Sequence, residues 1–214
     1  MNITITGANR GIGLSLTKLY LNQGHTVYAI CRNDDNLEAI KHNNLIIINN
    51  CDVRNEQSIQ TIGEYFKNIK IDLLINNAGI LRDETLGALN VQTINDQFQT
   101  NALAPLLVTQ SLLDSLITKP ENDTTVTKVI FITSRMGSIT DNTSGGRYGY
   151  RMSKVALNIG AKSMSVDLKP NNIAVGIIHP GLVGTQMIGG HGNLTPDEAA
   201  KCINDRIEGL NLDK

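Results

Sequence analysis

Tyr150 and Lys154 stand four residues apart in a segment whose apolar pattern predicts a helix. Side chains at this spacing lie on the same face of a helix, about 5–6 Å apart at Cβ. A phenol has a solution pKa of about 10, and a nearby ammonium lowers that pKa because it favours the phenolate. The pair therefore predicts an acid–base site in which the lysine lowers the pKa of the tyrosine. A half-buried tyrosine beside a solvated lysine has the same spacing, whereas Tyr148 has Met152 four residues later and no such partner.

A glycine-rich loop, Thr6-Gly-Ala-Asn-Arg-Gly-Ile-Gly13, follows the first apolar run. Gly7 permits a sharp turn, Gly11 lets the backbone approach a ligand, and Gly13 lets a helix pack on a strand. The N–H groups and dipole at the start of that helix favour a pyrophosphate. Glycines that serve packing alone give the same pattern, but the position after a first strand favours dinucleotide binding. No Gly-Lys-Ser/Thr sequence follows, which argues against a P-loop.

The residues after the second apolar run distinguish two dinucleotides. NAD sites usually place a carboxylate there, about 20 residues past the glycines. This chain has Ile30-Cys-Arg-Asn33 instead, and Arg10 lies within the glycine loop. Two guanidiniums suit a 2′-phosphate, so the sequence predicts NADP(H) over NAD(H). Ordinary surface arginines remain an alternative reading, and Asp34 and Asp35 lie close to this position.

The elements that must position these residues alternate in type along the chain. Apolar runs predict strands at Asn2–Gly7, Thr26–Cys31, Leu45–Asn49, Ile71–Ile75, Val129–Thr133 and Ile173–Ile178. Helical patterns begin at Ile12 (ended by Gly24) and at Thr195 (ending near Glu208), and cover Asn36–Lys41, Glu56–Lys67, Val91–Leu116 and Tyr148–Leu168. Continuous apolar strands are typical of a sheet covered on both faces. The pattern predicts an α/β fold, a doubly wound parallel sheet (Rossmann fold), as a single domain over 1–214 with a short substrate region at about 182–210.

Composition excludes several other classes. The 214 residues carry a net charge of −1, which argues against a nucleic-acid binder or a polybasic membrane binder. No apolar stretch approaches the roughly 18–20 residues of a membrane span. Three cysteines cannot all pair, and no secretory leader precedes the first apolar run, so we expect a cytoplasmic protein. No cluster has the spacing of metal ligands, and no metal is predicted.

The motifs together resemble the short-chain dehydrogenase/reductase family, whose order they follow. They are Thr6-Gly-x-x-x-Gly-Ile-Gly13, Asn76-Asn-Ala-Gly79, Ser134, Tyr150-x-x-x-Lys154 and Pro180-Gly181. The resemblance covers about residues 1–187. Within the family the chain is similar to the carbonyl-reductase branch that includes the C-factor and sniffer proteins. Cys31-Arg-Asn33, Ser134-Arg-Met-Gly-Ser138 and Tyr150-Arg-Met-Ser-Lys-Val-Ala-Leu-Asn158 carry this closer match.

The resemblance implies four catalytic residues. Tyr150 would give its proton to the substrate oxygen as hydride leaves the nicotinamide. Lys154 would lower the pKa of Tyr150 and hold the nicotinamide ribose hydroxyls. Ser134 would hydrogen-bond the carbonyl oxygen. Asn101 matches an asparagine that supports a water-linked proton relay to the lysine, although a lone asparagine in a helix is usually just solvated.

Two serines compete for one of these roles. The family spacing from serine to tyrosine is about 13 residues, whereas Ser134 stands 16 before Tyr150 (150 − 134) and Ser138 stands 12 before it (150 − 138). An enlarged loop at Asp141–Arg147 accounts for the difference. The position at a strand end favours Ser134, and we expect Ser138 to cap or fix the loop.

The resemblance also implies a set of cofactor contacts. Asp52 would accept a hydrogen bond from the adenine amine, or serve only as a turn residue. His191, in a glycine-rich loop, would contact substrate or lie on the surface. The implied cofactor contacts are Gly7, Asn9, Arg10, Gly11, Ile12, Gly13, Arg32, Asp52, Val53, Asn77, Ala78, Gly79, Tyr150, Lys154, Pro180, Gly181, Val183 and Thr185.

These residues predict an NADPH-dependent oxidoreductase that transfers hydride between nicotinamide and a small-molecule carbonyl or alcohol. Leu182, Met187 and Ile188 favour an apolar or aromatic substrate. A non-catalytic NADP-binding sensor on the same fold is the alternative, although such sensors often lose the tyrosine or the lysine. A sugar-nucleotide epimerase generally needs a larger substrate domain, and a methyltransferase does not need these motifs.

We expect a homodimer or a monomer. In relatives, the helices that match Val91–Leu116 and Tyr148–Leu168 commonly pair across a two-fold axis. Their apolar residues are numerous enough to serve both the sheet and a partner: Leu103, Leu106, Leu107, Leu112, Leu113, Val155, Leu157 and Ile159. The residues after Leu210 are too short and polar for the seventh strand of longer relatives, whose further contacts we do not expect.

Overall fold

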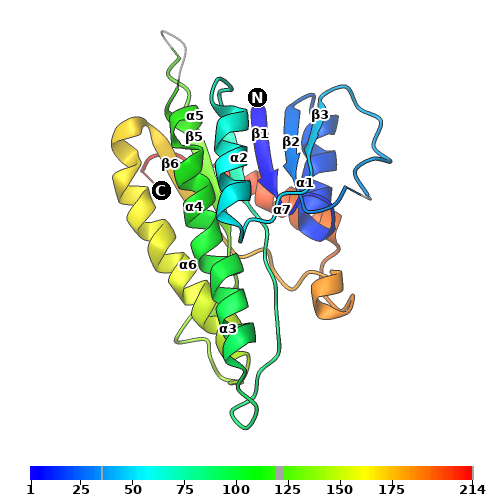
Figure 1. Ribbon diagram of the computed structural model, residues 1–214, viewed down its shortest axis with the longest axis vertical. Coiled ribbons are helices and arrows are strands. Elements are labelled where there is room, and N and C mark those ends of the chain that lie inside the picture. Colours follow the sequence, from blue (N-terminus) through cyan, green and yellow to red (C-terminus); the bar gives the residue numbers. More distant parts are fainter. Residues whose placement is uncertain (35, 119–122, 214) are drawn as a thin grey trace.

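Six apolar runs form one parallel sheet in the computed structural model, which describes residues 1–34, 36–118 and 123–213. Parallel pairing places the strands in the order β3-β2-β1-β4-β5-β6 (Figure 1). The order reverses between β1 and β4, and ligands of such sheets bind at the carboxyl ends beside this reversal. The strands are β1 (Asn2–Thr6), β2 (Thr26–Ile30), β3 (Leu45–Ile48), β4 (Leu73–Asn76), β5 (Thr127–Ile132) and β6 (Ile173–Ile178).

Helices cover both faces of the sheet, as the continuous apolar strands predict (Figure 1). On one face Leu16 and Ile203 bring α1 and α7 into the core, and on the other Phe66 and Leu157 bring in α2 and α6. The helices are α1 (Gly11–Asn22), α2 (Glu56–Phe66), α3 (Val91–Phe98), α4 (Ala104–Ser111), α5 (Leu113–Ile117), α6 (Tyr148–Asp167) and α7 (Pro196–Glu208). None of the helices in the described ranges is long and apolar enough to cross a membrane.

The helix predicted at Asn36–Lys41 is wrong. The backbone there makes a turn, in which the N–H groups of Leu37 and Glu38 both donate to the Asp34 carbonyl. One such turn fixes several residues for few hydrogen bonds, and a short polar segment does not extend it. Leu37 is fully buried and anchors the turn against the sheet. Asp35 lies outside the described residues.

The single long helix predicted over Val91–Leu116 is interrupted. Between α3 and α4 the chain makes a π-helical turn at Gln99–Leu103, where the Ala104 N–H donates to the Gln99 carbonyl five residues earlier. Pro105 has no N–H, so it cannot supply the bond that an α-helix would give to the carbonyl of Asn101. π-Helical turns are frequent at functional sites, and this one contains a predicted catalytic residue.

Candidate active site

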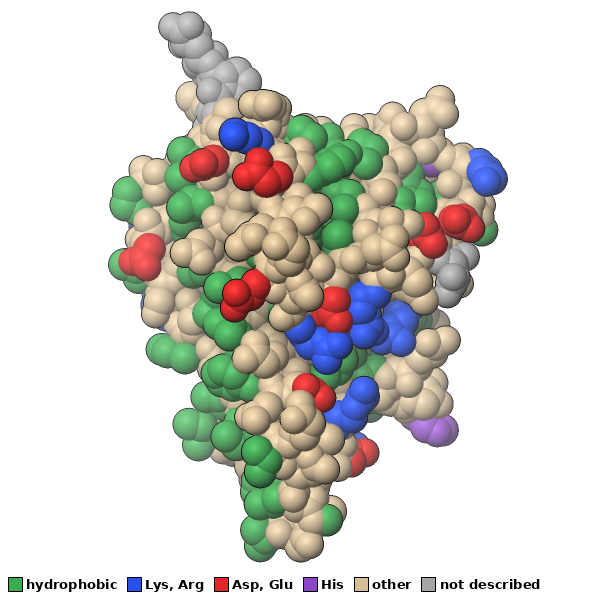
Figure 2. All heavy atoms as spheres, viewed as in Figure 1, with side chains coloured by type: hydrophobic (Ala, Val, Ile, Leu, Met, Phe, Trp, Pro, Cys, Tyr) green, Lys and Arg blue, Asp and Glu red, His purple; other side chains and the backbone are tan. Residues whose placement is uncertain are grey.

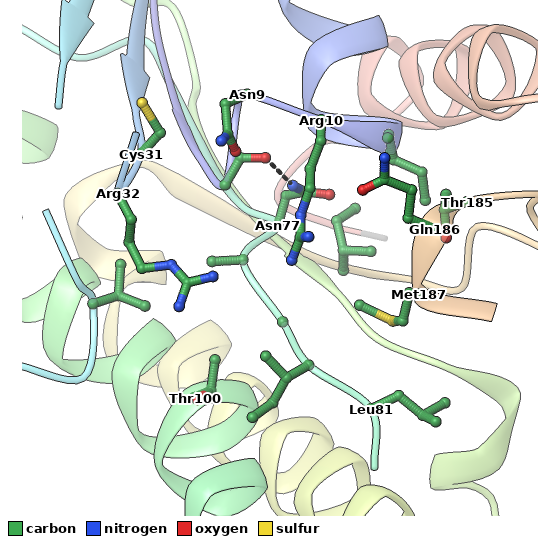
Figure 3. Close-up of a pocket in the computed structure, with 18 of the residues that line it drawn as sticks. Asn9, Arg10, Cys31, Arg32, Asn77, Leu81, Thr100, Thr185, Gln186 and Met187 are labelled. Atoms are coloured by element: carbon green, nitrogen blue, oxygen red, sulfur yellow. Dashed lines mark hydrogen bonds between the residues drawn. The ribbon is translucent and has the colours of Figure 1, made fainter. Parts of the chain in front are cut away.

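The carboxyl ends of the strands open into a cavity of about 580 Å³, which we call the first cavity. Loops after β1, β2, β4 and β6 and the start of α6 form its walls (Figure 3). Gly13 and Asn101 lie behind its surface. The predicted residues that line it are Gly7, Asn9, Arg10, Gly11, Ile12, Arg32, Asp52, Val53, Asn77, Ala78, Gly79, Tyr150, Lys154, Pro180 and Thr185.

The glycine loop is held in shape by contacts with the end of β4. Gly7 and Gly11 have φ of +64° and +51°, in the left-handed region that favours glycine. A Cβ on Gly13 would overlap the Gly7 carbonyl oxygen, so α1 packs against the loop without room for a side chain. The Asn77 amide donates to the carbonyls of Thr6 and Gly7, at 3.0 and 3.1 Å. The Asn-Asn-Ala-Gly motif therefore supports the loop as well as lining the first cavity.

Several arginine side chains line the part of the first cavity where we expect the adenosine of a dinucleotide to bind. Figure 3 shows Arg10 and Arg32 extending into it from the loops after β1 and β2. Arg54 and Arg82 also line the first cavity, which sequence reasoning did not predict because nothing in their local pattern marks them. Figure 2 shows one group of Lys and Arg side chains near the middle of the visible face.

Asp52 is both a turn residue and a cavity residue. Its carboxylate accepts from the Arg54 backbone N–H at 2.9 Å and from the Arg54 guanidinium, with Nη2 at 2.7 Å from Oδ2. These bonds, with the charge of Arg32, hold the pKa of Asp52 below its ordinary value against the opposing effect of burial. The carboxylate is therefore ionised and remains at the wall of the first cavity.

Tyr150 and Lys154 are both buried at the bottom of the first cavity, with 8% and 5% of their surfaces exposed. The Lys154 Nζ lies 5.8 Å from the centroid of the Tyr150 ring and donates a hydrogen bond to the Ile132 carbonyl at 2.8 Å. Burial lowers the pKa of Lys154 from 10.5 to about 8. The side chains share a face of α6, as their spacing predicts.

The pKa of Tyr150 shifts in the direction opposite to the predicted one. Burial raises it above 10.0, while a hydrogen bond with Ser134 and the charge of Arg147 oppose that rise. The predicted net lowering of this pKa is therefore wrong, because burial disfavours the phenolate more than Ser134 and the charge of Arg147 favour it. Arg147, which sequence reasoning did not single out, is the cation that acts on the phenol.

The two candidate serines have separate roles. Ser134 follows β5 directly after Thr133, accepts a hydrogen bond from the Met136 N–H at 3.1 Å, and lies near enough to the Tyr150 phenol to lower its pKa. Ser138 accepts from the Asp141 N–H at 3.3 Å and so fixes the loop. Ser134 is the serine beside the tyrosine.

Asn101 is fully buried, so the alternative of a solvated residue is wrong. Its amide nitrogen donates to the Ile80 carbonyl at 2.8 Å and to the Ser153 hydroxyl at 3.0 Å, and its oxygen accepts from the Ile80 N–H at 2.8 Å. Asn101 therefore joins the segment after Gly79 to α6, one residue before Lys154.

A second cavity, of about 630 Å³, adjoins the first at Tyr150. Leu81, Met136, Leu182 and Ile188 supply apolar walls. Besides Leu182 and Ile188, the predicted residues that line the second cavity but not the first are Ser134, Gly181 and Val183. The residues that were not predicted include Arg135, Arg147, Arg151 and His179. His191 is exposed and lines neither cavity. Among the residues that the structure describes, no group of three or more His, Cys, Asp or Glu is placed to hold a metal ion.

Known proteins are similar to this chain in both sequence and fold. Residues 1–193 match the family described as short chain dehydrogenase. The 1-hydroxy-2-glutathionyl-2-methyl-3-butene dehydrogenase of Rhodococcus sp. (strain AD45) is 31% identical over 215 residues, covering 97% of this chain and 91% of that protein. C-signal of Myxococcus xanthus is 40% identical over 142 residues, covering 66% of this chain and 82% of that protein.

Two solved structures are similar over nearly their full length. An NADPH-bound carbonyl reductase from chicken fatty liver has a TM-score of 0.90 and 32% identity, with 99% of this chain and 92% of that chain covered. Carbonyl reductase Sniffer of D. melanogaster has a TM-score of 0.88 and 33% identity, with 98% and 92% covered. The predicted resemblance, including that to the C-factor and sniffer branch, is confirmed. The chain belongs to the short-chain dehydrogenase family.

Proposed function

We propose that the protein is an NADP(H)-dependent carbonyl reductase or alcohol dehydrogenase in which Tyr150 exchanges a proton with the substrate oxygen. The observation that carries this proposal is the position of Tyr150, where the two cavities meet. One cavity has the glycine loop and arginines of a dinucleotide site, and the other has apolar walls that suit a carbonyl compound. The family as a whole acts on small-molecule substrates.

The first cavity fits a phosphorylated dinucleotide. The N-terminus of α1 has no side-chain cap and no acidic residue in its first turn, so its N–H groups are open to a pyrophosphate. Arg10 and Arg32 supply the guanidiniums that a 2′-phosphate requires. When bound, the nicotinamide supplies or accepts the hydride. The NADPH-bound relative from chicken supports this choice of cofactor.

Each catalytic side chain has a role that its surroundings support. Burial keeps Tyr150 protonated at neutral pH, which is the state that a proton donor needs for carbonyl reduction. Ser134 lines the second cavity beside Tyr150 and is placed to orient the carbonyl oxygen there. Lys154 lines the first cavity, where it would hold the ribose hydroxyls of the bound cofactor, and Asn101 fixes the segment after Gly79.

The test is the rate of NADPH oxidation with a panel of aldehydes, ketones and quinones, for the wild type and Tyr150→Phe. We expect Tyr150→Phe to lower kcat by about 10²–10⁴-fold, because it removes the acid, and to keep NADPH affinity within a few-fold. Tyr148→Phe is the matched control, since Tyr148 lines neither cavity. A Tyr150→Phe variant with more than about a tenth of wild-type kcat would exclude the proposed acid. A wild type that binds NADPH but reduces no carbonyl would favour the sensor.

We further propose that two copies of the chain associate through α3 and α6. The supporting observation is a row of exposed apolar side chains on α6, at Met152, Ile159 and Val166.

A further inference from the structure

Arg151 is a buried arginine that the proposed mechanism does not use. It is 9% exposed, and no carboxylate pairs with it among the described residues. Its Nε donates to the Gly146 carbonyl at 3.1 Å, and its Nη2 donates to the Ser144 hydroxyl at 2.9 Å and the Gly145 carbonyl at 3.3 Å. All three acceptors belong to one loop. A buried guanidinium without a counter-ion is costly, so these contacts require an explanation.

The loop that Arg151 holds has an unusual backbone. Gly145, Gly146 and Arg147 have φ of 62°, 62° and 52°, three left-handed residues in succession. Glycine adopts this conformation freely, but an arginine there is strained and persists only where its surroundings hold it. The Arg147 N–H donates to the Glu84 carbonyl at 2.8 Å, and its Nε pairs with Asp83 at 2.7 Å. These contacts, together with those of Arg151 to the loop, hold Arg147 in place.

Glu84 also holds the start of α6 in place. Its buried carboxylate accepts from the Gly149 N–H at 3.2 Å, within the first turn of the helix, and from the Gln97 amide at 2.5 Å. The start of α6 is thereby fixed one residue before Tyr150. Arg147 itself lines the second cavity, and its charge acts on the Tyr150 phenol.

We propose that Arg151 is a positioning residue that holds residues 144–147 against the start of α6 and so places the Arg147 guanidinium at the substrate side of Tyr150. Arg151 stands one helical turn after Arg147, and its backbone N–H donates to the Arg147 carbonyl at 2.9 Å. Its side chain reaches back over the loop from there. This role rests on the proposed function, because it concerns binding of the carbonyl substrate.

Kinetics of single and double variants test whether Arg151 acts through Arg147. We expect Arg151→Gln to lower kcat/KM for the carbonyl substrate about ten- to a hundred-fold, because displaced contacts at a reacting centre cost this much. NADPH affinity should stay within about two-fold, since Arg151 lines only the second cavity. Arg147→Gln should give a similar loss, and Arg147→Gln/Arg151→Gln should lose no more than Arg147→Gln alone. Arg151→Lys, which keeps the charge but not the fork of donors, should restore part of the activity.

The matched control is Arg206→Gln, which removes the same charge at an exposed position of α7 that lines neither cavity. Losses that add in the double variant, an equal loss in Arg206→Gln, or an equal loss of NADPH affinity would each overturn the proposal.

A second readout needs no turnover. We expect amide hydrogen exchange over residues 141–149 to speed up in Arg151→Gln, and less in Arg151→Lys, while exchange in the sheet is unchanged. Unchanged exchange in this segment would refute the positioning role even if the wild type reduced no carbonyl. If the wild type were inactive but exchange were faster in Arg151→Gln, the proposed function would be refuted, whereas the claim that Arg151 holds residues 144–147 would stand. If Arg151→Gln does not fold, Arg151→Lys carries the same comparisons.

Discussion

Burial acts on the two central side chains of the site in complementary ways. It raises the pKa of the Tyr150 phenol and lowers the pKa of the Lys154 ammonium, so both pKa values shift in the direction that favours the neutral form. The physical cause is the same, because a buried charge loses its solvation. A neutral phenol suits proton donation in carbonyl reduction. A lysine with a pKa of about 8 changes its charge within the accessible pH range, which makes burial at this site measurable.

Stability should therefore depend on pH through Lys154. Between pH 8 and about 10.5 the unfolded chain keeps a proton that folded Lys154 has lost, so the folded state gains stability as the pH rises. The pKa difference corresponds to roughly 3 kcal/mol. We expect the wild type to gain up to about this much over Lys154→Met between pH 8 and 10.5, in urea unfolding without cofactor. Lys162→Met, at an exposed lysine of the same helix, is the control, and a constant difference would contradict the shift.

Cofactor choice is also decided by single residues. We expect Arg32→Asp to weaken NADPH binding by about ten-fold or more, because one charge-assisted hydrogen bond to a phosphate contributes about 1.5–3 kcal/mol. NADH affinity should hold or improve, since NADH lacks the 2′-phosphate. Fluorescence titration of both cofactors measures this. Lys18→Asp, on the exposed side of α1, controls for the change in net charge, and equal wild-type affinities for NADPH and NADH would refute the assignment.

At the scale of elements, the glycine loop depends on how closely α1 approaches β1. The approach is limited by Gly13, where a Cβ would overlap the Gly7 carbonyl oxygen and crowd the Asn77 amide. The same amide connects the loop to β4. Gly13 therefore sets how closely α1, β1 and β4 pack together where they form the first cavity.

Gly13→Ala should destabilise the protein by about 1–3 kcal/mol, although alanine favours a helix more than glycine does. The added methyl has no room, and α1 must move away from the loop. NADPH affinity should fall with stability. Thermal unfolding and fluorescence titration give the two values, with Gly87→Ala as a control, because a Cβ at Gly87 meets nothing within 4 Å. A variant as stable as the wild type would show that the helix tolerates the shift.

For the whole molecule, the arrangement of helices leaves an apolar surface without cover. Met152, Ile159 and Val166, spaced seven residues apart on α6, are 57%, 65% and 60% exposed, and Val91 and Phe98 repeat that spacing on α3. Figure 2 shows hydrophobic side chains gathered along the side of the molecule where α6 lies. Of the residues predicted for this role, Leu112 and Leu157 are buried in the core and Ile159 is exposed. Apart from Ile159, the surface is therefore made of other side chains on the same helices.

We expect light scattering across a dilution series to show a dimer, because a self-complementary apolar surface buries itself in a two-fold contact. Ile159→Lys should shift the mass to that of a monomer, since a lysine in such a contact loses its solvation. Tyr65→Lys, at an exposed aromatic on α2, is the control and should keep the dimer. A wild type that is monomeric at high micromolar concentration would contradict this interface.

Local spacing in the sequence was enough to predict the alternation of strands and helices, the parallel sheet and the glycine loop. It also predicted that Tyr150 and Lys154 share one face of a helix. Each of these depends on residues a few positions apart, whose geometry follows from the period of a helix or strand. The motifs also carried the family resemblance. The helix boundaries around Gln99–Leu103 did not follow, because Pro105 and the packing of Asn101 act together there.

Only the tertiary structure decided the rest of the site. The burial of Asn101 and the supports of Arg147 depend on segments that meet from distant parts of the chain. The pKa direction of Tyr150 was predicted wrongly, because spacing shows the nearby ammonium but not the solvent that folding removes. Charge and spacing are local properties of a sequence, whereas burial is a sum over all the elements that pack around a residue.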